Sequence, residues 1–255
     1  MTNSATNSAY FPVSTHLFEM KGKDARDFLH RLTTANIRDM EPGDFRPGFF
    51  LNPQGKIRAL FRVGMREPDS FYLESEGGKG DAWKDALLGV IDQFTFAEKY
   101  ELTEVKGRAN VWIFGLDEAA ENRIEERAIE GETLLLFHGP KRSFGTAWTS
   151  VWGSPEGIER FVKSTAIRRF EESEFEALRI SSLFPRIDHE ILTETNPLEV
   201  GLRTGIADNK GCYPGQEVIE KIVSLGSPAK RLALVEGTGP RPAPGSRLIT
   251  EDGSE

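Results

Sequence analysis

The sequence predicts an α+β fold, on three observations. Segments with strand-like and helix-like patterns alternate between residues 17 and 182. A proline–glycine turn signal near residue 54 joins two strand-like runs, as in a hairpin. The chain of 255 residues is long enough to bury a substantial core. The alternation alone also fits an α/β arrangement.

Composition divides the chain into three parts. Residues 1–9 (MTNSATNSA) are small and polar, and we expect a disordered leader that lacks the apolar core of a signal peptide. Residues 10–226 contain no clear linker and no internal repeat, which predicts one α+β region. A Gly-Ser-Pro break at residues 226–228 predicts that a short C-terminal domain fills residues 227–255.

Charge and cysteine content narrow the classes of function. The net charge of −8 argues against a general nucleic-acid binder, and no apolar run approaches the length that spans a membrane. A single cysteine permits no internal disulfide and fits a reducing cytoplasm, where we expect the protein. One thiol cannot supply the several thiolates that hold an iron–sulfur cluster, and the four histidines lack metal-ligand spacing, so we expect no metal site.

The N-terminal half opens with a strand followed by a helix over residues 17–33. Residues 49–51 and 56–63 then form the two arms of the predicted hairpin. In the second arm Arg58 and Arg62 lie on the face opposite the apolar residues. These arginines are expected either to form a solvated face or to meet an anionic ligand.

Further elements are expected along the rest of the chain. A glycine-rich turn at residues 77–80 fits a plain loop better than a phosphate cradle, because the Walker pattern is absent. Ser154 and Pro155 have the residue types that open a helix. We expect helices at residues 81–94, 117–129, 154 onward and 171–182, and strands at residues 100–105, 111–114, 133–137, 146–151 and 231–235.

The stretch with the most chemical character is residues 210–217 (KGCYPGQE). It holds the only cysteine, Cys212, and its glycines and proline exclude a regular helix across it. Lys210 could supply a cation that favours the thiolate. A lone intracellular cysteine is more often a small buried residue. The polar, glycine-rich surroundings favour an exposed functional thiol instead.

This stretch resembles the signature of the YgfZ family of folate-binding proteins, whose mitochondrial relatives serve iron–sulfur cluster assembly. The family is similar in fold to the aminomethyltransferase (T-protein) of the glycine cleavage system. The resemblance extends to residues 17–37, 50–63 and 196–202. It implies a T-protein-like fold of two interleaved subdomains, with tetrahydrofolate as the cofactor.

The resemblance also implies roles for single residues. Glu199 would lie in the folate pocket, where a carboxylate can accept hydrogen bonds from the aminopyrimidine face of a pterin. From its residues alone, the sequence fits an ordinary surface glutamate at this position equally well. Arg58 and Arg62 would reach the glutamate tail, and Tyr213 and Gln216 are further candidates for contact with folate. Cys212 and Lys210 would act on a partner at the pocket rim.

One departure from the T-protein pattern bears on activity. In the aminomethyltransferases, the strand that corresponds to the second arm of this hairpin carries an aspartate that is essential to the transfer. The corresponding positions here are Ala59 and Leu60, and no carboxylate occurs between residues 54 and 66. Neither side chain can orient an amine or stabilise a developing positive charge.

The C-terminal residues resemble the start of the family's small β-barrel. Residues 231–235 and 247–250 would be its first two strands, and two strands cannot close a barrel. We therefore expect this barrel to be truncated or incomplete, or its other strands to be supplied otherwise.

Three functions follow as hypotheses. The first is a tetrahydrofolate-binding accessory protein that supports iron–sulfur proteins or their assembly machinery through Cys212. The second is a folate-dependent aminomethyltransferase, against which Ala59 and Leu60 count. The third is a thiol redox protein whose resolving thiol comes from another molecule. Whether the chain is an enzyme is left open, with a non-enzymatic or weakly catalytic factor favoured.

Overall fold

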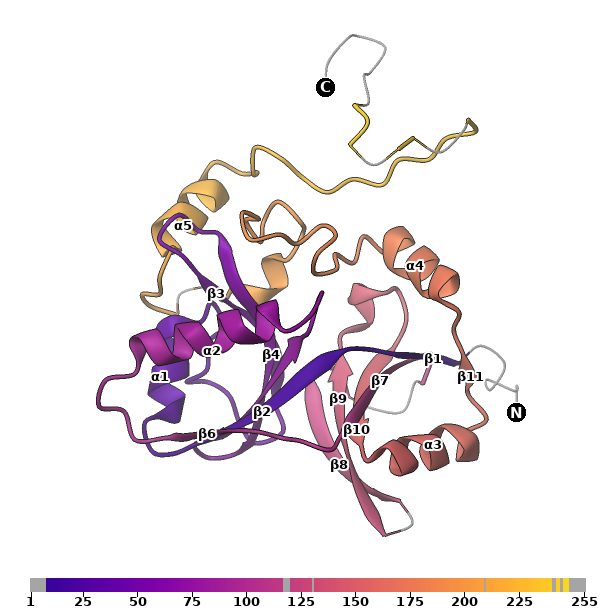
Figure 1. Ribbon diagram of the computed structural model, residues 1–255. Coiled ribbons are helices and arrows are strands. Elements are labelled where there is room, and N and C mark those ends of the chain that lie inside the picture. The colour runs from indigo at the N-terminus through magenta and orange to yellow at the C-terminus, as the bar shows by residue number, and fades with distance from the viewer. Residues whose placement is uncertain are drawn as a thin grey trace.

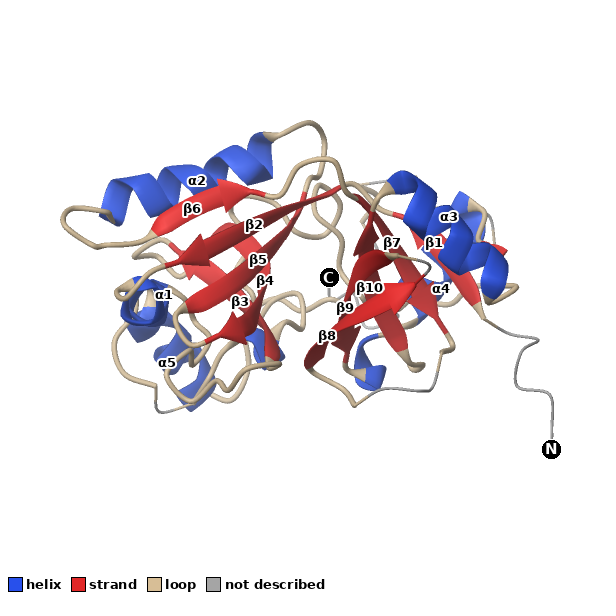
Figure 2. Ribbon diagram, turned by 90° about the horizontal axis from the view of Figure 1, so that it is seen from below, coloured by secondary structure: helices blue, strands red, loops and turns tan. Residues whose placement is uncertain are grey.

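The computed structural model describes residues 8–116, 120–129, 131–208, 210–239, 242–243 and 245–247. Two β-sheets lie side by side with helices on their outer faces (Figures 1 and 2). This is the predicted α+β class. Of the expected leader, residues 1–7 lie outside the described part, and Ala9 begins the first strand.

The five-stranded sheet is antiparallel throughout and contains the predicted hairpin. Its strands, in spatial order, are β3 (Phe45–Leu51), β4 (Ile57–Glu67), β5 (Ser70–Glu76), β2 (Thr15–Lys21) and β6 (Glu101–Glu104). Two amphipathic helices, α1 (Ala25–Leu32) and α2 (Ala82–Phe94), cover it (Figure 2). Their apolar faces bury Phe28, Leu29 and Leu87 against the sheet, as the helical spacing predicts.

The six-stranded sheet combines antiparallel pairs with one parallel pair, β1 with β11. Its strands, in spatial order, are β11 (Arg168–Arg169), β1 (Ala9–Pro12), β7 (Ala109–Phe114), β10 (Trp148–Gly153), β9 (Glu132–Gly139) and β8 (Arg123–Ile129). Helix α3 (Pro155–Ser164) packs on it through Ile158 and Phe161. Helix α4 (Glu172–Ser181) follows β11, close to β1 (Figure 1).

The expected helix at residues 117–129 is wrong in its described part, because residues 123–129 form β8. The glutamates and arginines there favour a helix locally, but pairing with the buried strand β9 overrides that preference. Residues 117–119 lie outside the described part of the chain.

The expected strand at residues 231–235 is also wrong. This segment extends over the surface without strand geometry (Figure 1). One backbone bond ties it down, from Leu232 N to Glu199 O at 2.8 Å. An isolated extended segment lacks the neighbouring strand that a ladder requires. Residues 248–250, the second expected strand, lie outside the described residues.

The two sheets share a core. Phe45 and Tyr72 from the five-stranded sheet meet Phe137 from the six-stranded sheet, with ring centres 5.0 and 6.2 Å from that of Phe137. A second contact is polar: buried Glu74 on β5 accepts hydrogen bonds from Ser150 and Trp152 on β10. The sheets therefore form one packed body.

Residues 187–219 close over the end of the β3–β4 hairpin (Figure 1). Ile57 N donates to Thr195 O, and the Asn196 amide donates to Gly55 O, each at 2.9 Å. This segment includes the one-turn helix η3 (Arg203–Gly205) and leads to α5 (Gln216–Ser224). Another one-turn helix, η2 (Lys141–Ser143), follows β9. The cysteine loop is thus set against the hairpin turn.

Candidate functional site

The cysteine loop displays its thiol. Cys212 is exposed, whereas Lys210 and Tyr213 on either side are only 7% and 9% exposed. Gly211 and Gly215 have φ angles of 93° and 82°, in the left-handed region that glycine enters without strain. A Cβ on Gly215 would lie 2.5 Å from Asn52 O, so only glycine lets the loop approach the hairpin turn this closely.

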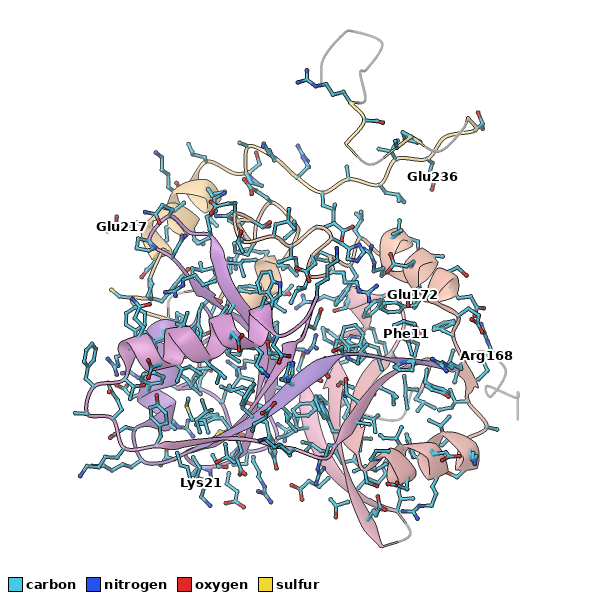
Figure 3. The ribbon with its side chains drawn as sticks, viewed as in Figure 1. Phe11, Lys21, Arg168, Glu172, Glu217 and Glu236 are labelled. Carbon is cyan, nitrogen blue, oxygen red and sulfur yellow. The ribbon has the colours of Figure 1, made fainter. Side chains whose placement is uncertain are left out.

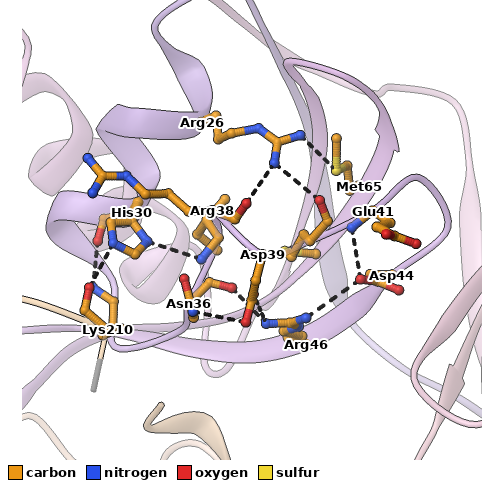
Figure 4. Close-up of polar contacts among 12 residues, drawn as sticks. Arg26, His30, Asn36, Arg38, Asp39, Glu41, Asp44, Arg46, Met65 and Lys210 are labelled. Atoms are coloured by element: carbon orange, nitrogen blue, oxygen red, sulfur yellow. Dashed lines mark hydrogen bonds and ion pairs between the residues drawn. The ribbon is translucent and has the colours of Figure 1, made fainter. Parts of the chain in front are cut away.

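Lys210 anchors the loop to α1. Its ammonium donates to the carbonyl oxygen of His30 at 2.6 Å, and the Lys210 carbonyl lies 2.9 Å from His30 Nε2 (Figure 4). His30 Nδ1 accepts from Ile37 N at 3.3 Å, so Nε2 carries the proton and donates to Lys210. No described hydrogen bond joins the ammonium to Cys212. The expected cation is buried beneath the thiol.

Burial governs the protonation of both loop anchors. It lowers the pKa of Lys210 to about 8, although the ammonium lies 4.9 Å from the centre of the Tyr213 ring. It raises the pKa of Tyr213 to about 12. In both groups, leaving water disfavours the charged form. Both shifts reflect the burial of these side chains within the folded loop.

A cavity of about 240 Å³ lies between this loop and α5. Lys210, Tyr213 and Gln216, which the sequence singled out, all contribute to its lining. Cys212 lies outside the lining, on the exposed side of the same loop. A partner that reaches the thiol would therefore meet this hollow beside it.

The three other predicted folate contacts lie in three separate places. Glu199 is 3.7 Å from Lys56 Nζ and accepts from Asn196 N at 3.1 Å. Arg58 donates to Gln93 on α2. Arg62 is buried and pairs with Glu74 and Glu76 on β5. The structure does not bring them together.

Arg62 is held by an ion-pair network that the sequence reasoning missed. Its guanidinium donates to Glu74 at 2.7 Å and to Glu76 at 3.2 Å, and stacks 4.9 Å from the centre of the Trp112 ring. Arg62 and Glu74 are direct partners across β4 and β5. The alternating carboxylates of residues 70–76 (SFYLESE) were the signal for this pairing.

A second cavity, of about 540 Å³, lies where β1, β7, α4 and residues 184–189 meet. Figure 3 shows Phe11 of β1 close to Glu172 of α4 at this place. Four aromatic rings wall it, those of Phe11, Trp112, Phe175 and Phe184. None of the residues singled out from the sequence as site residues lines it. Residues 77–80, which were expected to form a plain loop, and residues 184–189 contribute instead.

The polar groups of this cavity are mostly bonded to one another. Asp188 accepts from Lys79 N and from Trp83 Nε1. Its φ of 63° is unusual for a residue with a side chain, and these two bonds hold it there. Glu176 pairs with Arg179 and Arg186, which lowers the pKa of its carboxyl, most strongly through the Arg179 hydrogen bond. The cavity is therefore an aromatic hollow with a fixed polar rim.

Among the described residues there is no group of three or more histidine, cysteine or acidic side chains that could hold a metal ion. In the same part of the chain, no helix has both the length and the apolar character needed to cross a membrane.

Comparison with known proteins places this geometry in context. No family model matches the chain. A YgfZ tRNA-modifying protein of Hamiltonella defensa is 26% identical over 87% of this chain and 67% of its own length, and that of Vibrio atlanticus is 19% identical over 86% and 66%. In structure, the glycine cleavage aminomethyltransferase T of Bartonella henselae superposes with a TM-score of 0.70 over 86% of this chain, at 14% identity.

The chain is similar to the YgfZ proteins and has the T-protein fold. This confirms the resemblance that residues 210–217 indicated. The YgfZ-like chain also matches an aminomethyltransferase of Chlorobium chlorochromatii, at 27% identity over 80% of this chain. It spans 61% of that relative's length and 64% of the Bartonella chain.

The two positions that depart from the T-protein pattern are buried in this YgfZ-like chain. Ala59 is 0% exposed within the core beneath α1 and α2, and Leu60 is 9% exposed in the core under residues 187–219. Both side chains are packed as apolar residues.

Proposed function

We propose that the chain is a tetrahydrofolate-binding accessory protein that supports the assembly or repair of iron–sulfur proteins, with Cys212 as its functional thiol. The exposure of Cys212 carries this proposal. Burial of Lys210 and Tyr213 fixes the loop while the thiol between them stays open to a partner. Similarity to the YgfZ proteins supports the assignment.

The 540 Å³ cavity is the proposed folate site. Ligand pockets commonly enclose about 300–1,000 Å³ and combine apolar or aromatic walls with a few fixed polar groups. This cavity has both properties, and its aromatic walls suit a flat heterocycle. Glu199 and Arg58 lie outside it and are not needed for binding there.

The proposed role of the thiol is intermolecular. A single cysteine cannot hold an iron–sulfur cluster alone, so the other thiolates would belong to the partner. The cluster, or the protein that carries it, is then the cargo. The 240 Å³ hollow beside the loop would receive part of that partner.

A complementation experiment tests the role of the thiol. We expect Cys212→Ala to leave folding and tetrahydrofolate binding unchanged, yet fail to restore iron–sulfur enzyme activity in a strain that lacks the protein. Ser164→Ala, an exposed change on α3 that lines neither cavity, is the matched control and should restore activity fully. Full restoration by Cys212→Ala would refute the proposed thiol function.

Similarity to an aminomethyltransferase keeps transfer chemistry as the second candidate. We expect the purified chain to release no ammonia from an aminomethyl donor in the presence of tetrahydrofolate. The reason is that buried Ala59 and Leu60 offer no carboxylate to the reacting amine. Ammonia release at a rate proportional to protein concentration would favour the transferase instead.

A further inference from the structure

Two buried nitrogen donors beside the 540 Å³ cavity have no acceptor. They are Trp112 Nε1 and Arg62 Nη2, on residues that are 2% and 6% exposed. The guanidinium carbon of Arg62 lies 4.9 Å from the centre of the Trp112 ring, so both donors belong to one cluster. Trp112 lines the cavity. A buried donor without an acceptor is unfavourable, and an oxygen atom of a ligand would offset that cost.

A carboxylate with spare acceptor capacity stands next to these donors. Glu76 lines the cavity, its side chain is 13% exposed, and Oε1 lies 3.2 Å from Arg62 Nη1. No described residue donates a hydrogen bond to Oε2. The remaining cavity carboxylates are already bonded: Glu172 to Arg186, Glu176 to Arg179 and Arg186, and Asp188 to Lys79 N and Trp83 Nε1.

We infer that Trp112 and Glu76 together recognise a cyclic amide edge of the ligand, a ring carbonyl next to a ring N–H. Trp112 Nε1 donates to the carbonyl oxygen, and Glu76 accepts from the adjacent N–H. Arg62 is a positioning residue, because it holds Glu76 through Nη1 and stacks on Trp112.

The chemistry of the wall agrees with this assignment. Burial raises the pKa of Glu76 even though Arg62 pairs with it, so a further donor would stabilise its charged form. A ligand N–H would supply one. A pterin carries the required edge in its 4-oxo group and N3–H. In naming that ring, the inference rests on the proposed folate function.

A matched pair of ligands distinguishes the proposed folate binding from the recognition of the cyclic amide edge by Trp112 and Glu76. Tetrahydrofolate and tetrahydroaminopterin differ at position 4, where an amine replaces the carbonyl and N3 loses its hydrogen. Calorimetry under nitrogen should show that the wild-type chain binds tetrahydrofolate about tenfold more tightly than tetrahydroaminopterin. In the analogue, the 4-amine would face the Trp112 N–H, donor against donor, and the bare N3 would face the Glu76 carboxylate, acceptor against acceptor. Trp112→Phe and Glu76→Gln should each reduce that preference to near unity.

Trp148→Phe is the control variant. Trp148 also stacks on Arg62, at 5.6 Å, but its Nε1 donates to Pro140 O and it does not line the cavity, so the preference should survive. Melting curves of all three variants check folding. Equal wild-type affinity for both compounds would overturn the inference and leave folate binding intact, as would a preference that persists in both Trp112→Phe and Glu76→Gln. Binding of neither compound would overturn both claims.

Discussion

Lys210 shows how a residue two positions from a thiol can hold the fold. Its ammonium lies inside the protein, bonded to the carbonyl of His30. Proximity in sequence suggested a cation for Cys212, whereas burial makes Lys210 an anchor. The sequence identified the loop and its exposed cysteine, but the direction of the lysine depends on α1, which lies far away along the chain.

The buried lysine predicts a pH dependence of stability. Its pKa falls from 10.5 to about 8 on folding, so between these pH values the unfolded chain binds the proton more tightly. The free energy of unfolding therefore rises with pH across this window, by at most about 1.4 kcal/mol per pH unit from this group. Below about pH 8 both states bind the proton, so this group no longer changes the free energy of unfolding with pH and its destabilising effect is fully present.

Urea unfolding between pH 8 and 9.5 measures the effect. Lys210→Met should unfold with a flatter pH dependence than the wild type, since it carries no titrating amine. Lys221→Met, at an exposed site on α5, should keep the wild-type slope. Parallel slopes for wild type and Lys210→Met would contradict the assignment.

At the scale of elements, the sequence predicted those that depend on local signals and missed those that depend on tertiary contacts. The hairpin, α2, α3 and α4 followed from turn residues, helical spacing and the Ser-Pro start of α3. Strand β8 did not, because its charged residues favour a helix until β9 pairs with them. The folate contacts expected at Arg58, Arg62 and Glu199 were separated for a similar reason: their partners come from other strands and helices.

Helix α3 offers a quantitative test of one such local signal. Ser154 Oγ accepts from Gly157 N at 2.9 Å and donates to Glu132 at 2.6 Å. We expect Ser154→Ala to lower the free energy of unfolding by about 1 kcal/mol, the usual cost of losing such a cap. Chemical denaturation gives the value. Ser181→Ala, at the exposed end of α4, should change it far less.

At the scale of the molecule, the shared core between the sheets determines cooperativity. Phe137 is fully buried between Phe45 and Tyr72, and Glu74 adds a polar contact nearby. Neither sheet keeps its core if the other unfolds. No sequence pattern gave this, because alternation within a strand does not say which sheet covers it.

Phe137→Ala should therefore weaken both sheets at once. We expect the free energy of unfolding to fall by about 3–5 kcal/mol, the range for removing a buried phenylalanine side chain. Circular dichroism and tryptophan fluorescence should still report one coincident transition. Two separate transitions would indicate that the sheets unfold independently.

The bond between Lys210 and His30 joins positions 180 residues apart. During synthesis, the first of these residues leaves the ribosome long before the second, so the cysteine loop has nothing to close against until the body of the protein exists. In a nascent or damaged chain, Cys212 would lie on a flexible segment rather than on an anchored loop. A partner of the proposed thiol function would therefore meet the loop in its fixed form only on a folded molecule.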